Sequence, residues 1–249
     1  MIEIISLEKA FGRQKVLRGV NLTIGNGEVM AIIGESGGGK SVLLKHLIGI
    51  LKPDSGRILV DGEDITALSP GEFDRIRNKF GVVFQEGALF DSMTVFENIV
   101  FPLKEKTRLG REEIRARGVR GLEDVGLRDM GDKYPSEISG GMKKRVALAR
   151  ALIAKPSVVL FDEPTTGLDP VIMNSIHGLI RQTHQKYGFT GIIISHEIPE
   201  IFTISDKVAM LHDGSIVEAG TPGEIRSSSN PVVRRFVTTG CEDYSKSIP

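Results

Sequence analysis

Residues 29–41 read VMAIIGESGGGKS, and the fold can be inferred outward from this stretch. The apolar run Val29–Ile33 predicts a strand buried on both faces, as strands are in a parallel sheet. Gly34–Ser41 fits the phosphate-binding pattern G-x-x-x-x-G-K-[ST], in which glycines let backbone N–H groups curl around phosphate oxygens. In this pattern Lys40 reaches the outer phosphates and Ser41 ligates Mg²⁺. The alternative is a flexible glycine loop with an exposed lysine.

The residues after the loop predict an amphipathic helix that Pro53 ends. Its apolar positions are Leu43, Leu44, Leu47, Ile48 and Leu51. A buried strand before the loop and a helix after it are the context that the phosphate-binding pattern requires.

The composition is that of a globular protein with balanced charge. The chain has 249 residues, of which 40% are hydrophobic, with 32 Lys and Arg against 32 Asp and Glu. A domain size of about 150 residues predicts one or two domains. Zero net charge argues against a nucleic-acid partner, because affinity for a phosphate backbone depends on surplus cations. The one cysteine, Cys241, excludes an internal disulfide and fits a reducing cytoplasm.

No targeting or membrane-spanning segment is expected, because the longest apolar runs are far shorter than the ~20 residues that a spanning helix needs. Any membrane-spanning part of a complex is then expected to belong to another chain.

The rest of the chain predicts an α/β core interrupted by a helical insertion. Further apolar runs predict strands at 2–8, 58–60, 158–161, 192–194 and 208–211. Charged segments predict helices near 70–78, 94–106, 111–125 and 141–154. We expect a core at 1–85 and 156–225, a helical subdomain at about 86–155, and a C-terminal tail at about 226–249.

Two adjacent carboxylates follow the apolar run Val158–Phe161. Successive side chains on a strand point to opposite faces, so Asp162 and Glu163 are expected to have different roles. Asp162 suits the Mg²⁺ water shell, and Glu163 suits orienting or deprotonating the attacking water. The alternative is a solvated acidic turn before Pro164.

Polar side chains also follow two other apolar runs, with Gln85 after residues 80–84 and His196 after residues 192–195. Ligands of open α/β sheets bind at the carboxyl ends of the strands, so these residues are expected to join the phosphate loop and the carboxylates in one site. Gln85 would contact Mg²⁺ or the attacking water, and His196 the γ-phosphate. Taken singly, a lone histidine or glutamine is more often structural.

A second glycine-rich segment, Ser139–Gly141, opens another predicted helix with Ser139 as its N-cap. Lys143, Lys144 and Arg145 follow, although cations in the first turn oppose the helix dipole. An anion that meets this helix end would explain them. The alternative is a set of solvated cations on a surface helix.

The ordered set of motifs resembles an ABC-transporter nucleotide-binding subunit over about residues 2–225. The motifs are the phosphate loop, Gln85, Ile138–Met142 (ISGGM), Leu160–Glu163 (LFDE), Gly167–Asp169 (GLD) and His196. The resemblance implies an α/β fold with a P-loop NTPase (RecA-like) core, an N-terminal antiparallel β subdomain and an inserted ABC α-helical subdomain. It also implies ATP hydrolysis, with ATP and Mg²⁺ bound, in a head-to-tail homodimer that sandwiches two ATP molecules.

The resemblance assigns a role to each matching residue. Phe11, with Val16 nearby, matches the aromatic residue that stacks on adenine, and the alternative for Phe11 is a core residue. Asp169 matches the aspartate that passes between the two sites of the dimer. Phosphate contacts are implied for Gly34, Glu35, Ser36, Gly37, Gly38, Gly39, Lys40 and Ser41. The residues implied to cap the partner's nucleotide are Ser139, Gly140, Gly141 and Met142. The catalytic residues are Glu163, His196 and Gln85, and the Mg²⁺ ligands are Ser41, Gln85 and Asp162.

Ile138 and Met142 depart from the Leu and Gln of the common signature, which puts in doubt only the contacts of a Gln side chain. The variable regions are similar to the ATPase of Mla/Mce-type lipid transporters. They are Gln85–Phe90 (QEGALF), Met142, Ser195–Glu200 (SHEIPE) and Val233–Phe236 (VRRF).

This closer resemblance implies movement of phospholipid or a related lipid at the bacterial cell envelope. The implied partners are a multi-pass permease, an Mce-domain lipid-binding protein and a STAS-domain protein. The implied location is the cytoplasmic side of the inner membrane, as a peripheral subunit.

Three alternatives stay open: an importer for a small solute such as an amino acid or a metal, a soluble ABC ATPase that acts on ribosomes or DNA, and a P-loop kinase. The apolar stretch Gly87–Phe90 also has two interpretations. It forms a groove for a cytoplasmic helix of the permease, with Phe90 as an anchor, or Leu89 and Phe90 fold into the chain's own core.

Overall fold

The computed structural model describes residues 1–245, with side chains described for residues 1–239. The chain forms two compact units. The first comprises Met1–Arg77 and Thr190–Pro249, and the second comprises Asn78–Phe189. The end of the predicted tail, 246–249, lies outside the described residues, and the side chain of Cys241 lies outside the described side chains.

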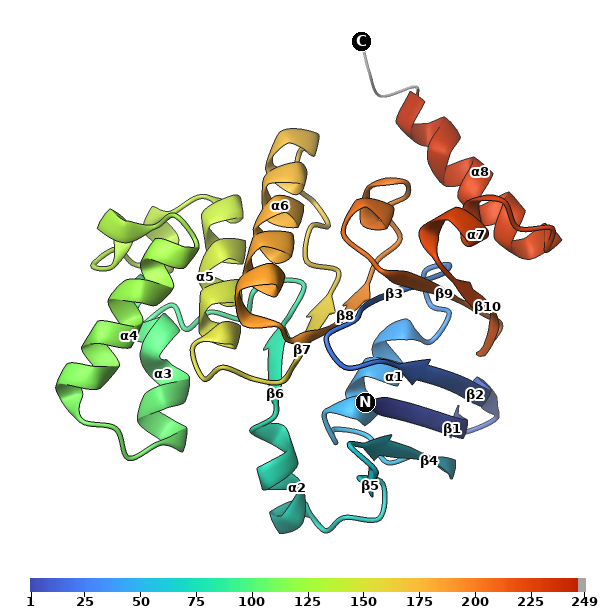
Figure 1. Ribbon diagram of the computed structural model, residues 1–249, viewed down its shortest axis with the longest axis horizontal. Coiled ribbons are helices and arrows are strands. Elements are labelled where there is room, and N and C mark those ends of the chain that lie inside the picture. Colours follow the sequence, from blue (N-terminus) through green and yellow to red (C-terminus); the bar gives the residue numbers. More distant parts are fainter. Residues whose placement is uncertain (246–249) are drawn as a thin grey trace. The chain divides into compact units, whose positions relative to one another are not determined.

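An antiparallel sheet in the first unit has the strand order β2-β1-β4-β5 (Figure 1). Its strands are β1 (Ile2–Phe11), β2 (Gln14–Ile24), β4 (Ser55–Val60) and β5 (Glu63–Asp64). Ile2 lies opposite both Ile24 and Val60, and all three side chains are buried. This sheet is the antiparallel β subdomain that was predicted near the N-terminus.

Four more strands of the first unit follow the order β10-β9-β3-β8. They are β3 (Val29–Ile33), β8 (Thr190–Ile194), β9 (Lys207–His212) and β10 (Ser215–Gly220). β3 pairs in parallel with both β8 and β9, and all five residues of β3 are buried. The prediction of a doubly buried strand before the glycine loop is therefore confirmed.

Strand β10 is absent from the sequence-based prediction. It pairs antiparallel with β9 through the two-residue turn Asp213-Gly214, in which both residues have positive φ, 49° and 78°. Asp-Gly is a strong signal for such a hairpin turn, so the sequence contained the information.

The helices of the first unit are α1 (Lys40–Leu47), α2 (Pro70–Arg77), α7 (Pro222–Arg226) and α8 (Pro231–Ser245), with a short 3₁₀ turn at Glu200–Thr203. Helix α1 ends before the predicted stop at Pro53. Gly49 has φ +68°, and the N–H of Ile50 donates to the Lys45 carbonyl at 2.9 Å, which is a Schellman ending. A Cβ at Gly49 would lie 2.5 Å from the Phe73 ring, so only glycine fits here.

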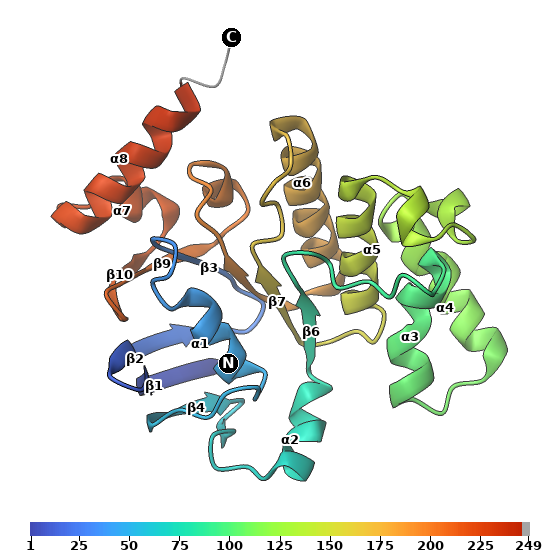
Figure 2. The same cartoon turned by 180° about the vertical axis from the view of Figure 1, so that it is seen from behind.

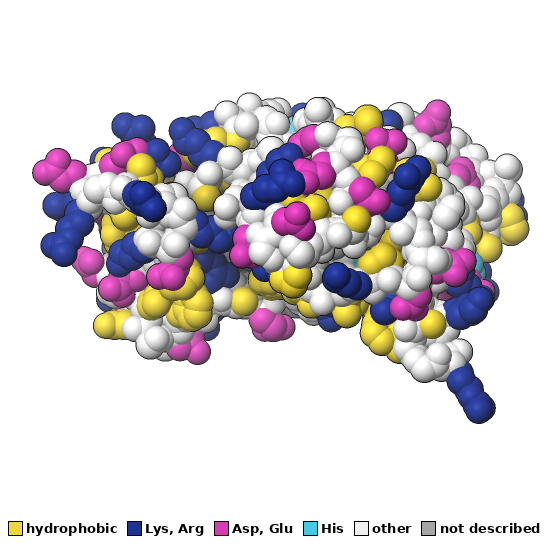
Figure 3. All heavy atoms as spheres, turned by 90° about the horizontal axis from the view of Figure 1, so that it is seen from below, with side chains coloured by type: hydrophobic (Ala, Val, Ile, Leu, Met, Phe, Trp, Pro, Cys, Tyr) yellow, Lys and Arg dark blue, Asp and Glu magenta, His cyan; other side chains and the backbone are white. Residues whose placement is uncertain are grey.

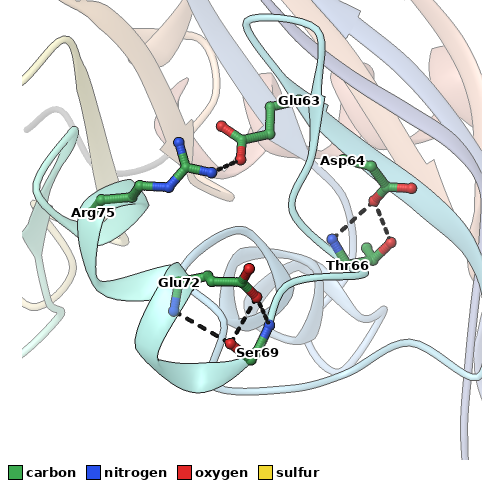
Figure 4. A network of polar contacts seen from close by, with 6 residues as sticks. All are labelled: Glu63, Asp64, Thr66, Ser69, Glu72 and Arg75. Carbon is green, nitrogen blue, oxygen red and sulfur yellow. Dashed lines mark hydrogen bonds and ion pairs between the residues drawn. The ribbon is translucent and has the colours of Figure 1, made fainter.

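Helix α2 is stabilised at its start by a local network that Figure 4 shows. The Ser69 N–H and hydroxyl both donate to a Glu72 carboxylate oxygen, at 2.9 and 2.7 Å. The Thr66 N–H donates to Asp64 at 2.9 Å, so an acidic side chain fixes the connection that leads into the helix.

The second unit contains the parallel pair β6 (Phe80–Val83) and β7 (Val158–Asp162), with helices beside it (Figure 2). Its helices are α3 (Val95–Lys106), α4 (Arg111–Asp124), α5 (Gly140–Leu152) and α6 (Pro170–Tyr187), with 3₁₀ turns at Arg128–Met130 and Pro135–Glu137. The four helices predicted near 70–78, 94–106, 111–125 and 141–154 are confirmed as α2, α3, α4 and α5.

Helix α6 is missing from the sequence-based prediction although it carries strong end signals. Asp169 is its N-cap, Pro170 occupies the first helical position, and Gly188 follows its end with φ +66°.

Charges of both signs are interspersed on the face that Figure 3 shows, as expected for a chain without net charge. Within residues 1–245, no helix combines the length and the apolar character that crossing a membrane requires.

Candidate functional site

The backbone of the glycine loop is shaped by positions that only glycine can fill. Gly34 has φ +151°, and a Cβ there would lie 2.2 Å from the Leu211 carbonyl oxygen. Gly39 has φ +99° and forms the N-cap of α1 without a side-chain hydrogen bond. The Gly38 N–H donates to the Glu35 carbonyl at 3.1 Å, which closes the turn. The backbone conformation of the loop therefore follows from the spacing of its glycines in the sequence.

Lys40 lies at the start of α1 with only 4% of its surface exposed. Its Nζ donates to the Gly34 carbonyl at 2.8 Å and to the Glu35 carbonyl at 2.9 Å. The ammonium group is therefore held against the mouth of its own loop, where an ATP phosphate would offer stronger, charged acceptors. The alternative of an exposed lysine on a flexible loop is wrong.

Val16 lies against the same loop, since a Cβ on Gly39 would approach its Cγ1 to 3.2 Å and its carbonyl oxygen to 3.1 Å. Phe11 ends β1 with 46% of its surface exposed, and the Lys9 ammonium lies 5.7 Å from the centre of its ring. The alternative that Phe11 is a core residue is wrong. An exposed aromatic ring is available for stacking, and adenine stacking stays a prediction.

His196 follows β8 and is exposed. Ile32 pairs with Ile194 in the parallel ladder, so Gly34 and His196 each lie two residues beyond that pair. The carboxyl ends of β3 and β8 thus bring the phosphate loop and His196 to the same edge of the sheet.

The second unit brings its own candidate residues together in the same way. Val83 pairs with Phe161 in the parallel ladder, so Gln85 and Glu163 each lie two residues beyond a paired position, with Asp162 one residue beyond. Glu163 has φ +47°, a left-handed conformation that is uncommon for residues other than glycine. Such strain costs about 1–3 kcal/mol and is concentrated at functional sites.

The loop after Glu163 is fixed by hydroxyl groups. The Thr166 hydroxyl donates to the Glu163 carboxylate at 3.2 Å. The Thr165 hydroxyl lies 3.3 Å from Nε2 of the buried His177, and burial lowers the pKa of His177 to about 4. The imidazole is therefore neutral at physiological pH and acts here as a structural partner of the loop.

Ser139 is the N-cap of α5, and its hydroxyl accepts the Met142 N–H at 3.3 Å, which confirms the predicted cap. A Cβ on Gly141 would lie 2.7 Å from Ile172 Cγ2, so this glycine permits close packing of α5 on α6. A Cβ on Gly140 would meet open space. Ser139 and Gly140 are therefore at the open side of the helix start.

Two of the three cations after the signature have partners within the chain. Lys144 Nζ donates to the Gln85 carbonyl, and Arg145 donates to the Val125 carbonyl at 3.0 Å and the Ser175 hydroxyl at 2.7 Å. Lys144 and Arg145 therefore have partners within the chain, and an anion at this helix end stays a prediction. Their cationic groups satisfy carbonyl oxygens that are distant in the sequence.

Sequence reasoning missed the groups that hold the loop after Gln85. Arg150 donates to the Gly87 carbonyl at 2.6 Å and to the Ala88 carbonyl at 2.7 Å. The fully buried Asn98 accepts the Phe90 N–H at 2.8 Å and donates to the Phe90 carbonyl at 3.0 Å. No local pattern identifies these partners, because each depends on how helices α5 and α3 pack.

The apolar side chains of this loop are not fully buried. Phe90 is 42% exposed and its ring lies 4.8 Å from that of Phe101, while Leu89 is half-buried. The interpretation that Leu89 and Phe90 fold into the chain's own core is therefore wrong for Phe90, while Leu89 is partly covered.

Asp169 accepts the N–H groups of Val171 and Ile172, each at 3.0 Å, as the N-cap of α6. Its predicted role in communication between two sites stays a prediction.

The comparison with protein families decides what kind of protein this is. A family model described as ABC transporter matches residues 17–166, which is more than half of the chain. The chain belongs to the ABC transporter family. The motifs predicted this family.

Curated relatives carry three different transport names. The chain is 44% identical over 236 residues to the probable ribonucleotide transport ATP-binding protein mkl of Mycobacterium tuberculosis, which covers 95% of the chain and 66% of mkl. It is 44% identical over 243 residues to the methionine import ATP-binding protein MetN of Carboxydothermus hydrogenoformans, and the match covers 96% of this chain and 72% of MetN. It is 39% identical over 226 residues to the intermembrane phospholipid transport system ATP-binding protein MlaF of Escherichia coli, and the match covers 91% of this chain and 84% of MlaF. The chain thus spans just under two thirds of the length of mkl.

Solved structures of ABC cassettes share the fold. The dimeric post-hydrolysis state of the cassette MJ0796, bound to ADP and Pi, has a TM-score of 0.81 at 31% identity, over 89% of this chain and 99% of that one. The protein cbiO1 from Clostridium perfringens has a TM-score of 0.85 at 33% identity, over 98% and 97%. The predicted fold class is confirmed.

Proposed function

We propose that this chain is the ATP-hydrolysing subunit of an ABC transporter that moves phospholipid or a related lipid at the bacterial cell envelope. The observation that carries the lipid assignment is the similarity to MlaF, of which the chain covers the largest share among the relatives described above. The segments Gln85–Phe90 and Ser195–Glu200 and the signature variant Met142 support the same subfamily.

In this proposal the loop Gly34–Ser41 binds the phosphates of ATP, and Lys40 turns from its own carbonyls to the outer phosphates. Phe11 stacks on adenine with Val16 beside it. The hydroxyl of Ser41, the amide of Gln85 and the carboxylate of Asp162 are the hard oxygen donors that Mg²⁺ prefers, so the donor set fits this ion. When bound, Mg²⁺ neutralises charge on the β- and γ-phosphates.

Glu163 is the general base of the proposed reaction. It accepts a proton from water as the water oxygen bonds to the γ-phosphorus, and the bond to the ADP oxygen breaks. His196 donates a hydrogen bond to the γ-phosphate. The left-handed backbone of Glu163 and its contact from Thr166 fix the carboxylate in one orientation.

The proposal places two copies of the chain head to tail, so that Ser139, Gly140, Gly141 and Met142 of one copy contact the nucleotide held by the phosphate loop of the other. Dimeric cassettes among the similar structures support a homodimer. Asp169 would connect the two sites.

The transporter's other subunits would be a multi-pass permease, an Mce-domain lipid-binding protein and a STAS-domain protein, with this chain bound at the cytoplasmic side of the inner membrane. The exposed ring of Phe90 is a candidate anchor for a cytoplasmic helix of the permease.

A second candidate function is import of a small solute, and the higher identity to MetN favours it. The fold is shared by both kinds of transporter, so the cassette alone does not decide the cargo.

The test is purification of the tagged chain from membranes, with mass spectrometry of the proteins and lipids that accompany it. Glu163→Gln is used to hold the complex in the ATP-bound state, and Lys40→Ala is the control that does not bind ATP. The proposal expects a permease and an Mce-domain protein with the chain, and phospholipid above the level of the Lys40→Ala sample. A permease with a solute-binding protein and no enriched lipid would favour the small-solute importer instead.

A further inference from the structure

A cavity of about 500 Å³ lies in the second unit among helices α4, α5 and the end of α6. These three helices lie side by side in both Figures 1 and 2. None of the residues that line the cavity belongs to the predicted nucleotide, signature or metal sites. Its volume is within the range of about 300–1,000 Å³ that small-molecule sites occupy.

Part of the cavity lining is apolar. Ala149, Leu152 and Ile153 from the end of α5 line the cavity together with Val125 after α4, and all four side chains are buried. Such a surface favours an apolar chain or ring over a fully hydrated ion.

The charged part of the lining carries more positive than negative charge. The cavity lining includes the cations Arg117, Arg120, Lys155 and Lys186 against the carboxylates Glu113 and Asp124.

Both carboxylates already have cationic partners. Glu113 accepts from Arg117 at 2.5 Å, and Asp124 accepts from Lys186 at 2.5 Å and also from the Tyr187 hydroxyl.

Of the four cations in the lining, Arg120 and Lys155 have no carboxylate partner within residues 1–239. Both are exposed, and within residues 1–239 neither side chain has a hydrogen bond or an ion pair. The cavity therefore joins a buried apolar wall to two cations that no carboxylate of the described chain neutralises.

We propose that this cavity binds a small anionic amphiphile. The anionic head, a carboxylate or a phosphate monoester, pairs with Arg120 and Lys155, and the apolar part lies against Leu152 and Ile153. Arg offers a planar fork of N–H donors that matches both head groups, and Lys adds a second charge. The proposal is independent of the transported cargo.

The test is isothermal titration calorimetry of the full chain with three single-chain probes below their micelle concentrations. Dodecanoate and dodecyl phosphate carry the expected charge, and dodecyltrimethylammonium is the cationic control. We expect both anions to bind one per chain and the cation not to bind. The tighter anion distinguishes a carboxylate ligand from a phosphate ligand.

Paired variants locate the binding. Arg120→Gln with Lys155→Gln should weaken binding of both anions by about ten-fold or more, because charge-assisted hydrogen bonds are lost. The matched control is Lys104→Gln with Arg115→Gln, which removes two exposed cations from α3 and α4 that do not line the cavity, and it should leave affinity unchanged.

A third variant tests the apolar part without changing charge. Ala116 lines the cavity from an exposed position on α4, so Ala116→Phe can fill the cavity while the helix stays folded, as circular dichroism would verify. It should weaken both anions by about ten-fold. Absence of anion binding, equal binding of the cationic probe, or full affinity in the Arg120→Gln, Lys155→Gln chain would overturn the proposal.

Discussion

Two helices of this chain, one in each unit, start in glycine-rich segments and have lysine within their first five residues. At α1 the N-cap is Gly39, no side chain caps the helix, and Lys40 donates to carbonyls of its own loop. At α5 the N-cap is Ser139, whose hydroxyl caps the helix, and Lys144 donates to the carbonyl of Gln85, 59 residues away.

The two helix starts compensate the unfavourable interaction of a cation with the helix dipole in two ways. A cation near a helix start opposes the helix dipole, and in both places carbonyl oxygens compensate. The acceptors of Lys40 lie five and six residues away, so this lysine stabilises its own loop. The acceptor of Lys144 lies on another segment, so this lysine connects the signature helix with the loop after β6.

The largest effect is expected at a residue outside both helix starts, and it separates binding from hydrolysis. Glu163→Gln should lower the rate of ATP hydrolysis by about 10²- to 10⁴-fold, because an amide does not accept the proton of the attacking water. ATP binding should remain, and the dimer should become stable enough for size-exclusion chromatography. Single-turnover hydrolysis and equilibrium binding are the measurements, with Glu86→Gln, an exposed carboxylate nearby, as the control. Hydrolysis at the wild-type rate would remove Glu163 from the catalytic role.

The second prediction compares the two lysines directly. Lys40→Ala should weaken ATP binding by about 1,000-fold, which corresponds to about 4 kcal/mol for the loss of two charged phosphate contacts. Lys144→Ala should leave ATP affinity near the wild-type value, because its partner is a carbonyl of the chain itself. Calorimetric titration with ATP is the measurement. Equal losses in the two variants would mean that both helix starts bind phosphate in the same way.

The third prediction uses pH to test how His177 supports the loop after Glu163. Burial lowers the pKa of His177, next to the loop after Glu163, from 6.5 to about 4. Between these values the unfolded chain binds a proton that the folded chain does not, so stability falls as the pH decreases through this window, by about 3 kcal/mol in total. Above about pH 7 this contribution is constant.

His177→Gln should remove most of this pH dependence, whatever it does to stability at neutral pH. Urea denaturation at pH 7.5, 5.5 and 4.5 is the measurement. Some dependence should remain, because burial also lowers the pKa of His46. An unchanged slope in His177→Gln would show that the imidazole is not the group that titrates.

The smallest effect is expected from the groups that tie α5 to the loop after Gln85. Arg150→Met removes the donors to the Gly87 and Ala88 carbonyls and should lower the free energy of unfolding by about 1–3 kcal/mol. Lys143→Met, on the same helix, is the control and should stay within about 0.5 kcal/mol. Urea denaturation and amide hydrogen exchange of residues 84–90 are the measurements. If the two variants are equally stable, α5 does not fix this loop.

The parts of the molecule that the sequence predicted well are those whose causes are local. The run Val29–Ile33 and the glycines that follow it define strand, turn and helix start with partners a few residues away. The end of α1 at Gly49 and the start of α6 at Asp169 also had local signals, and these were missed.

The interactions of Lys144, Arg150 and Asn98 had no such signal. Lys144 and Arg150 meet carbonyls 59 to 63 residues away, and the sequence does not show which carbonyl a cation will meet. Asn98 accepts an N–H group only eight residues away, but its burial depends on the packing of α3. The sequence therefore identified the candidate chemical groups of the site and left the supports that hold them undetermined.

In the proposed head-to-tail dimer, the two glycine-rich helix starts act on the same ATP from two different subunits. The most direct test mixes chains that carry Lys40→Ala with differently tagged chains that carry Ser139→Arg, and adds an ATP analogue that crosslinks near its γ-phosphate. In the mixed dimer, one composite site has both an intact phosphate loop and an intact signature. We predict that the label appears on the helix at Ser139 of the Lys40→Ala chain, whose own loop does not bind ATP. Label confined to the chain with intact Lys40 would contradict the account.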